Sequence, residues 1–298
     1  DDNCDTDAIT PGPQCTLRAA VMEANAKPGP DNIQFVDNTD GGNTITLTLG
    51  GAGDASQGDL DITEQVSIDG IAAFGRPRTS LLTATPNRFF DINVPAGQVV
   101  SLSELRLTGG DLSSDSGGAV RARGNGMLVI DTVEFRNNEA PGGGALDTTI
   151  DTVVRNSHFE ANISFFSSAA INSMNADLLV ERSSFLDHLV AGKTNQTIGS
   201  FGDGSLSVIA STLSDNNTGV RGTSNSILIE RTTIVSNNGD AVDLGPNSTV
   251  VLRGNILTNS SGDDCSFTAP GNLSSTYNLI QDGQGSCTLG PGNVSGSP

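Results

Sequence analysis

From about residue 98 the chain repeats a short pattern, and this repeat restricts the possible folds more than any other feature. Each repeat has an apolar run, a few polar residues, one large apolar anchor residue, and then asparagine or another polar residue. Successive anchors are 24, 26, 28, 21 and 22 residues apart. A period of about 20 to 30 residues without helix predicts a parallel β-helix, in which each repeat forms one coil. The anchors are Phe135, Phe159, Phe185, Leu213, Ile234 and Ile256.

Two further rows of residues align with the anchors. Five residues before each anchor stands an aliphatic residue, which we expect to fill the interior of the coil. Three residues after each anchor stands an asparagine, replaced once by His188. Stacked side-chain amides of this kind satisfy the backbone groups of successive tight turns. The aliphatic row is Ile130, Val154, Val180, Val208, Ile229 and Val251. The predicted asparagine ladder is Asn138, Asn162, Asn216, Asn237 and Asn259.

A third row stands six residues before each anchor and is mostly apolar. Strand alternation predicts that this row, which we call the outer stripe, faces outwards. An apolar stripe along the outside of a solenoid is typical of an interface, and a loop or tail folded over it is an equal alternative. The predicted interface residues are Val129, Val153, Leu179, Leu228 and Val250, with Ser207 interrupting them.

The N-terminal part of the chain reads as less regular coils preceded by one helix. Segments such as NIQFV and NTITLTL bring the total to about ten coils. In residues 16–26, Leu17, Ala20, Val21 and Ala24 recur at three- and four-residue steps, and Thr16 can cap the first turn. The helix would close the first coil, whose edge otherwise leaves backbone groups unpaired. We predict one all-β domain over 1–298, a right-handed parallel β-helix with a cap (1–30), coils (31–260) and a C-terminal loop and tail (261–298).

Cysteine positions and net charge restrict the setting of the protein. Cys4 lies near Cys15, and Cys265 lies near Cys287, which predicts two local disulfides and an oxidising, extracytoplasmic location. The net charge of −19 argues against nucleic acid as a partner, because phosphates require a basic face. No apolar run approaches the ~20 residues of a membrane span.

The segment CTLRAA at residues 15–20, followed by EANA, GPDNIQF, VSIDG and RFFDI, resembles a known family. It is similar to secreted bacterial β-helix proteins that begin with a Cys-Ser-Leu-Arg-Glu-Ala motif. The likeness covers residues 4 to 110 closely, with Thr16 and Ala19 departing from the motif. The resemblance implies the fold and export from the cell, and it implies little about activity.

The best catalytic candidate among the repeats is the group Glu134, His158 and Arg182. Glu134 and His158 each immediately precede an anchor, so they should lie side by side on adjacent coils. A carboxylate beside an imidazole could perform acid–base catalysis while arginine holds an acidic substrate. The alternative, which we favour, is a surface ladder of alternating charge, because stacked opposite charges are expected on any solenoid. That ladder would contain Asp131, Arg155 and Glu181.

Calcium and carbohydrate are the remaining ligand candidates. Asp54, Asp59 and Asp61 in GDASQGDLD supply oxygen ligands, but their spacing follows neither the EF-hand template nor the glycine-rich nonapeptide of calcium β-rolls. We therefore expect ordinary polar loops and no cofactor, with calcium binding as the weaker alternative. An extracellular glycan is a candidate partner. The absence of tryptophan and the single tyrosine disfavour a dedicated carbohydrate-binding module.

Together these features predict a secreted, non-enzymatic extracellular or cell-surface structural protein, used in adhesion, a matrix or a self-assembling fibre. Its partner could be another copy of itself, arranged head-to-tail or side by side, because the C-terminal end has no helical cap. The alternative is a polysaccharide lyase or glycoside hydrolase of the β-helix type.

Overall fold

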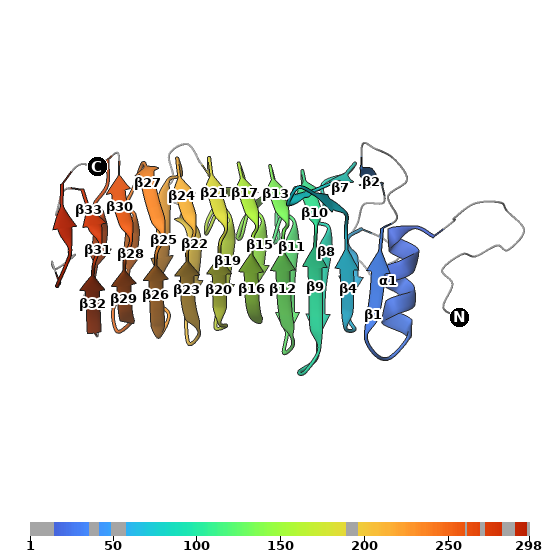
Figure 1. Ribbon diagram of the computed structural model, residues 1–298. Helices are drawn as coiled ribbons and strands as arrows, with labels where there is room; N and C mark the ends of the chain where they lie inside the picture. The colour runs from blue at the N-terminus through green and yellow to red at the C-terminus, as the bar shows by residue number, and fades with distance from the viewer. Residues whose placement is uncertain are drawn as a thin grey trace, which may run out of the picture.

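The computed structural model describes residues 15–35, 42–48, 58–188, 196–259, 261–268, 272–281 and 290–296. Apart from one short helix and one antiparallel hairpin, the strands of these residues are parallel and stack coil upon coil along one axis (Figure 1). Three parallel sheets of ten, eleven and nine strands run along the stack. The predicted parallel β-helix is confirmed. Nine coils contribute a strand to all three sheets, slightly fewer than the ten predicted.

The strands are distributed over the three sheets in a fixed rotation. The first sheet contains β1 (Asp31–Gln34), β4 (Val66–Asp69), β9 (Val99–Ser103), β12 (Met127–Asp131), β16 (Asp151–Arg155), β20 (Leu178–Glu181), β23 (Ser205–Ile209), β26 (Ser226–Glu230), β29 (Thr249–Arg253) and β32 (Asn272–Thr276). The second contains β2 (Asn43–Leu47), β7 (Thr79–Thr83), β10 (Leu105–Thr108), β13 (Glu134–Arg136), β17 (His158–Glu160), β21 (Ser184–Leu186), β24 (Thr212–Ser214), β27 (Thr233–Asn237), β30 (Ile256–Asn259), β33 (Leu279–Ile280) and β34 (Val294–Ser295). The third contains β3 (Leu60–Ile62), β8 (Phe90–Val94), β11 (Val120–Gly124), β15 (Leu146–Thr148), β19 (Ile171–Met174), β22 (Gln196–Phe201), β25 (Thr218–Gly222), β28 (Val242–Leu244) and β31 (Cys265–Phe267). Two small sheets pair β14 (Glu139–Ala140) with β18 (Ile163–Ser164), and β5 (Ala72–Ala73) with β6 (Arg76–Pro77).

The interior is filled by the rows that the repeat predicts, from Phe135 as far as Ile234. The anchors pair in register and are buried, and the first three form a ring stack. The ring centroids of Phe135 and Phe159 are 4.5 Å apart, and those of Phe159 and Phe185 are 4.7 Å apart. The aliphatic row pairs in register from Ile130 to Ile229 and is fully buried.

The last predicted repeat is wrong by one residue. Ile229 pairs with Leu252 rather than Val251, and Ile234 pairs with Leu257 rather than Ile256. The pairing of β27 with β30 contains a register shift between Val235 and Asn237. The sequence alignment matched Asn259 with Asn237 correctly, but without the shift it assigned the earlier residues of the strand to the wrong partners by one position. As a result Val250, predicted to face outwards, is fully buried, and Val251 takes its place in the outer stripe.

The predicted asparagine row lies buried at the corner that follows the second sheet. Each described side chain accepts a hydrogen bond from the backbone N–H of the equivalent residue in the preceding coil. The bonds are Asn138 N to Asn162 Oδ1 (3.0 Å), Asn162 N to His188 Nδ1 (3.0 Å), His188 N to Asn216 Oδ1 (3.1 Å), and Asn216 N to Asn237 Oδ1 (3.0 Å). His188 is therefore a rung of this ladder, and the side chain of Asn259 lies outside the described residues.

A second ladder, not anticipated from the sequence, occupies the corner between the first and second sheets. It lies two residues before each anchor, and its members share a side-chain oxygen rather than a residue type. Here too the oxygen accepts a hydrogen bond from a backbone N–H of the preceding coil, for example from Val133 N to Ser157 Oγ at 3.2 Å. The row continues through Ser183, Ser211, Thr232, Asn255, Asn278 and Asn293.

The predicted N-terminal helix is confirmed as α1 (Leu17–Ala26), which lies at the N-terminal end of the stack (Figure 1). Thr16 is its N-cap and accepts a hydrogen bond from the N–H of Ala19 at 3.1 Å. Leu17, Val21 and Ala24 are buried against the first coil. Within the described residues, no helix is long and apolar enough to cross a membrane.

The predicted cysteine pairs remain predictions, because Cys4 and Cys287 lie outside the described residues. The part of the chain that the structure describes holds no free cysteine.

His188 makes the stability of the stack depend on pH. Burial lowers the pKa of this fully buried imidazole from 6.5 to about 3. The folded protein therefore binds fewer protons than the unfolded chain, so this contribution is complete above pH 6.5 and is lost as the pH falls towards 3. The loss should reach about 1.4 kcal/mol per pH unit within that range. We predict that His188→Asn, which restores the residue type of the other rungs, reduces the pH dependence of the unfolding free energy between pH 6 and 4. Urea unfolding would measure it, and an unchanged slope would contradict the assignment.

Candidate functional site

The predicted candidates Glu134 and His158 lie next to each other on the outer face of the second sheet. Register pairing places them in one row across adjacent coils, with Arg106 before Glu134 and Ser184 after His158. These four residues belong to β10, β13, β17 and β21, and each stands one residue before an inward-facing apolar residue. The row is thus a direct consequence of the coil register.

Glu134 is held between two arginines. Its carboxylate accepts from Arg106 Nε at 2.8 Å and from Arg136 Nε at 3.1 Å, and its side chain is 7% exposed. Burial alone would raise the pKa of Glu134, but the hydrogen bond from Arg106 and the charges of both arginines outweigh burial and lower it. Glu134 is therefore a fixed anion and a weak base, which is unfavourable for general acid–base catalysis.

His158 extends the network from Glu134 towards the next coil. Its Nδ1 lies 2.7 Å from Ser184 Oγ, and its Nε2 lies 3.1 Å from Glu160 Oε2. Glu160 in turn pairs with Arg136 at 2.5 Å. A continuous chain of polar contacts thus runs from Arg106 to Ser184 across four coils, and both ring nitrogens of His158 are engaged.

Arg182 does not join Glu134 and His158. It pairs with Glu181, and its Nε donates to Asn156 Oδ1 at 3.0 Å. The predicted ladder is in register, since Asp131 pairs with Arg155 and Arg155 with Glu181. The Asp131 carboxylate also accepts from Asn156 Nδ2 at 2.8 Å.

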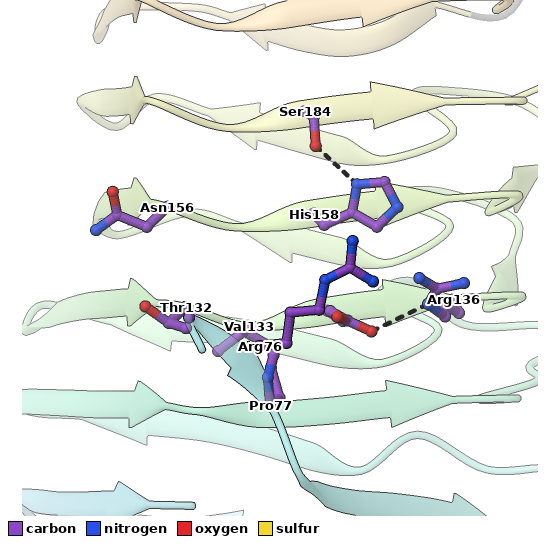
Figure 2. Close-up of a pocket in the computed structure, with 10 residues that line it drawn as sticks. Arg76, Pro77, Thr132, Val133, Arg136, Asn156, His158 and Ser184 are labelled. Atoms are coloured by element: carbon purple, nitrogen blue, oxygen red, sulfur yellow. Dashed lines mark hydrogen bonds and ion pairs between the residues drawn. The ribbon is translucent and has the colours of Figure 1, made fainter. Parts of the chain in front are cut away.

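A hairpin from an earlier coil turns this flat row into a pocket. The hairpin of β5 and β6 crosses the sheet beside Val133 and contributes Gly75, Arg76 and Pro77 to a cavity of about 210 Å³ (Figure 2). The cavity's other lining residues are Thr132, Val133, Glu134, Arg136, Asn156, His158 and Ser184. Sequence reasoning missed Arg76 because nothing in the repeat places the hairpin over later coils. It could have found Arg106, which precedes Leu107 as Glu134 precedes Phe135.

A second polar cavity, of about 370 Å³, lies beside the third sheet and contains a buried ion-pair network. Arg88 Nε contacts Asp59 Oδ2 at 2.6 Å, with the two side chains 5% and 8% exposed, and Arg88 also reaches Asp115. Arg121 binds Asp91 and Asp115. Burial raises the pKa of Asp59 despite its arginine partner. Burial would likewise raise the pKa of Asp115, but hydrogen bonds from Arg121 and Arg88 lower it to about 2.

The calcium candidates are not brought together as a metal centre in the described part of the chain. Asp59 is occupied by Arg88, and Asp54 lies outside the described residues. The described residues contain no group of three or more His, Cys, Asp or Glu side chains suited to a metal ion.

The corrected outer stripe lies on the outer face of the first sheet. Its members pair in register from Val129 to Val251, and most are half-buried. A serine extends the row at each end, Ser101 before Val129 and Ser274 after Val251. Its use as an interface stays a prediction.

Comparison with known proteins adds only distant likenesses. No protein-family model and no curated protein matches the chain. Among solved structures, the A-module of Azotobacter vinelandii mannuronan C-5 epimerase AlgE6 is 14% identical, with a TM-score of 0.42, covering 95% of this chain and 82% of that one. The A-module of the AlgE4 epimerase from the same organism is 13% identical, with a TM-score of 0.36, covering 94% and 95%. Such weak likeness carries no inference about substrate or activity.

The buried Arg88–Asp59 pair generates a stability prediction. Arg88→Met leaves Asp59 uncompensated in a buried position, so we expect a loss of about 3–5 kcal/mol in the free energy of unfolding at pH 7. Arg221→Met is the matched control, because the Arg221 side chain is 49% exposed and pairs with Asp243 at 3.1 Å. The control should lose no more than about 1 kcal/mol. Equal losses in the two variants, measured by urea unfolding, would contradict the buried network.

Proposed function

We propose that the protein is a non-enzymatic extracellular or cell-surface structural protein, a rigid β-helical rod that serves in adhesion, a matrix or a fibre. The observation that carries this proposal is the engagement of the candidate catalytic groups. Glu134 is fixed between Arg106 and Arg136, and both nitrogens of His158 have partners. Groups locked in such a ladder stabilise neighbouring coils rather than exchange protons with a substrate.

The extracellular setting is part of the proposal. It is supported by the resemblance of residues 4 to 110 to secreted β-helix proteins and by the local spacing of the four cysteines. Self-association through the outer stripe or the ends of the stack belongs to the same proposal. The stripe then includes Val251 in place of Val250.

A polysaccharide lyase or hydrolase remains the second candidate, and one observation favours it. Ser184, His158 and Glu160 form a hydrogen-bonded chain beside the cavity, in the order that lets an imidazole take a proton from a hydroxyl and be stabilised as a cation. The position of these three residues on a sheet surface weakens this candidate. The side chains of His158 and Glu160 are 28% and 29% exposed, so water competes for each hydrogen bond.

The two candidates separate in a turnover assay. The purified protein would be incubated with a panel of neutral and acidic polysaccharides, with and without calcium, and new chain ends would be measured. We expect no cleavage by the wild type, Glu134→Gln or His158→Ala proteins. Cleavage by the wild type that His158→Ala abolishes would overturn the structural role, whereas cleavage that persists in both variants would assign the enzyme to another site and also overturn it.

A further inference from the structure

The hairpin that covers the cavity ends in a turn that folding alone does not explain. Ala73 pairs with Arg76, and the two residues between them, Phe74 and Gly75, have φ angles of 54° and 73°. A two-residue turn with both φ angles positive is usually formed by Asn-Gly, since a bulky residue is strained there. Phe74 is also fully exposed, so burial does not offset the strain. A strained and exposed aromatic residue points to a contact with something outside the chain.

Other residues of this protein have positive φ, but they lie at the coil corners. Thr132, Asn156 and Arg182 occupy the equivalent corner position in successive coils, where strands on both sides and the ladder below fix the backbone. The tip of the hairpin has no such ladder. The choice of phenylalanine there is therefore separate from the architecture of the coils.

Arg76 supplies the charge of the site. Within the described residues its side chain has neither a hydrogen bond nor an ion pair, and Figure 2 shows it extending from the hairpin towards His158. The neighbouring carboxylates are already matched, Glu134 by Arg106 and Arg136, and Glu160 by Arg136. Arg76 thus adds an uncompensated positive charge to the cavity, on a chain whose net charge is −19.

The chemistry around Arg76 selects a ligand with three properties. A guanidinium binds a carboxylate through two parallel hydrogen bonds. Thr132, Asn156 and Ser184 line the same cavity with hydroxyl and amide groups. Each already has a partner within the chain, and the second donor or lone pair that it retains suits a hydroxyl-rich ligand. Phe74 offers an apolar face of the kind that covers the C–H face of a sugar ring. A carboxylate-bearing saccharide combines all three.

We propose that the hairpin of residues 71–78 and the cavity beneath it bind a carboxylate-bearing oligosaccharide, with Arg76 holding the carboxylate and Phe74 packing on a ring. This proposal rests on the adhesive role above in one respect, namely that the saccharide is held without being cleaved. The proposal thus specifies where the rod binds its partner and that the partner is an acidic saccharide.

Titration calorimetry of the full chain tests the ligand class. The probes are trigalacturonate and its methyl ester, which keeps the sugar rings and removes the negative charges. We expect the acid to bind at least about tenfold more tightly than the ester, because a charge-assisted bidentate pair is lost in the ester. Chromatography of the recovered ligand shows whether it has been shortened.

Two substitutions test the assigned roles against one control. Arg76→Gln should weaken binding by about tenfold or more, whereas Arg221→Gln, which removes one positive charge at the third sheet, should leave the affinity unchanged. Phe74→Asn places the favoured residue in the turn, so it should weaken binding while keeping or raising the thermal midpoint. A purely structural Phe74 would not produce that combination.

The outcomes separate the two proposals. Failure of trigalacturonate to bind at millimolar concentration, equal binding of the ester, or full affinity in Arg76→Gln would each overturn this inference and leave the structural role standing. Binding accompanied by shortening of the ligand would support the site and overturn the non-enzymatic role.

Discussion

The structure depends on how its coil corners satisfy their backbone N–H groups. Each coil must bend between sheets at residues with positive φ, such as Thr132 and Asn137. These residues still donate to a backbone carbonyl of the next coil, but the residue after each bend does not. At these corners a side-chain oxygen or ring nitrogen from the next coil accepts the N–H that the bend leaves unpaired, as Ser157 does for Val133 and Asn162 for Asn138. An unpaired buried N–H would cost about 1–3 kcal/mol at every corner. The two ladders repeat this compensation along the stack.

The same register that builds the ladders also builds the outer surface. Because each coil sits directly on the one before it, outward residues of neighbouring coils form rows. Arg136 and Glu160 of a neighbouring row join Arg106, Glu134, His158 and Ser184 into a chain of contacts. A row on a flat sheet has no walls. The hairpin of β5 and β6 supplies one, and with it the cavity and the uncompensated charge of Arg76 (Figure 2). The repeated coil register therefore places the polar residues of the site, and the hairpin, which is not part of the repeat, encloses them in a cavity.

The sequence predicted the structural features that repeat from coil to coil. It did not predict features that interrupt the repeat or that are formed by different residue types in successive coils. The anchors and aliphatic row follow from apolar periodicity, so they were predictable as far as Ile234. The final coil was misaligned because Val250, Val251 and Leu252 are all apolar, and Asn255, the rung of the second ladder, would have fixed the register. That ladder was missed because Ser, Thr and Asn share only a side-chain oxygen. The cavity was missed because the hairpin meets residues about 55 to 110 positions later in the chain, a contact with no local signal.

Amide hydrogen exchange measured by NMR tests the role of the corner ladders most directly. If side chains of the next coil close the corners, the N–H groups of Ser157, Asn162 and Asn216 should exchange only when the whole stack unfolds, as slowly as those of the central strands. The N–H groups of Phe74 and Gly75 at the tip of the hairpin should exchange much faster. Corner amides that exchange as fast as the hairpin tip would contradict the account.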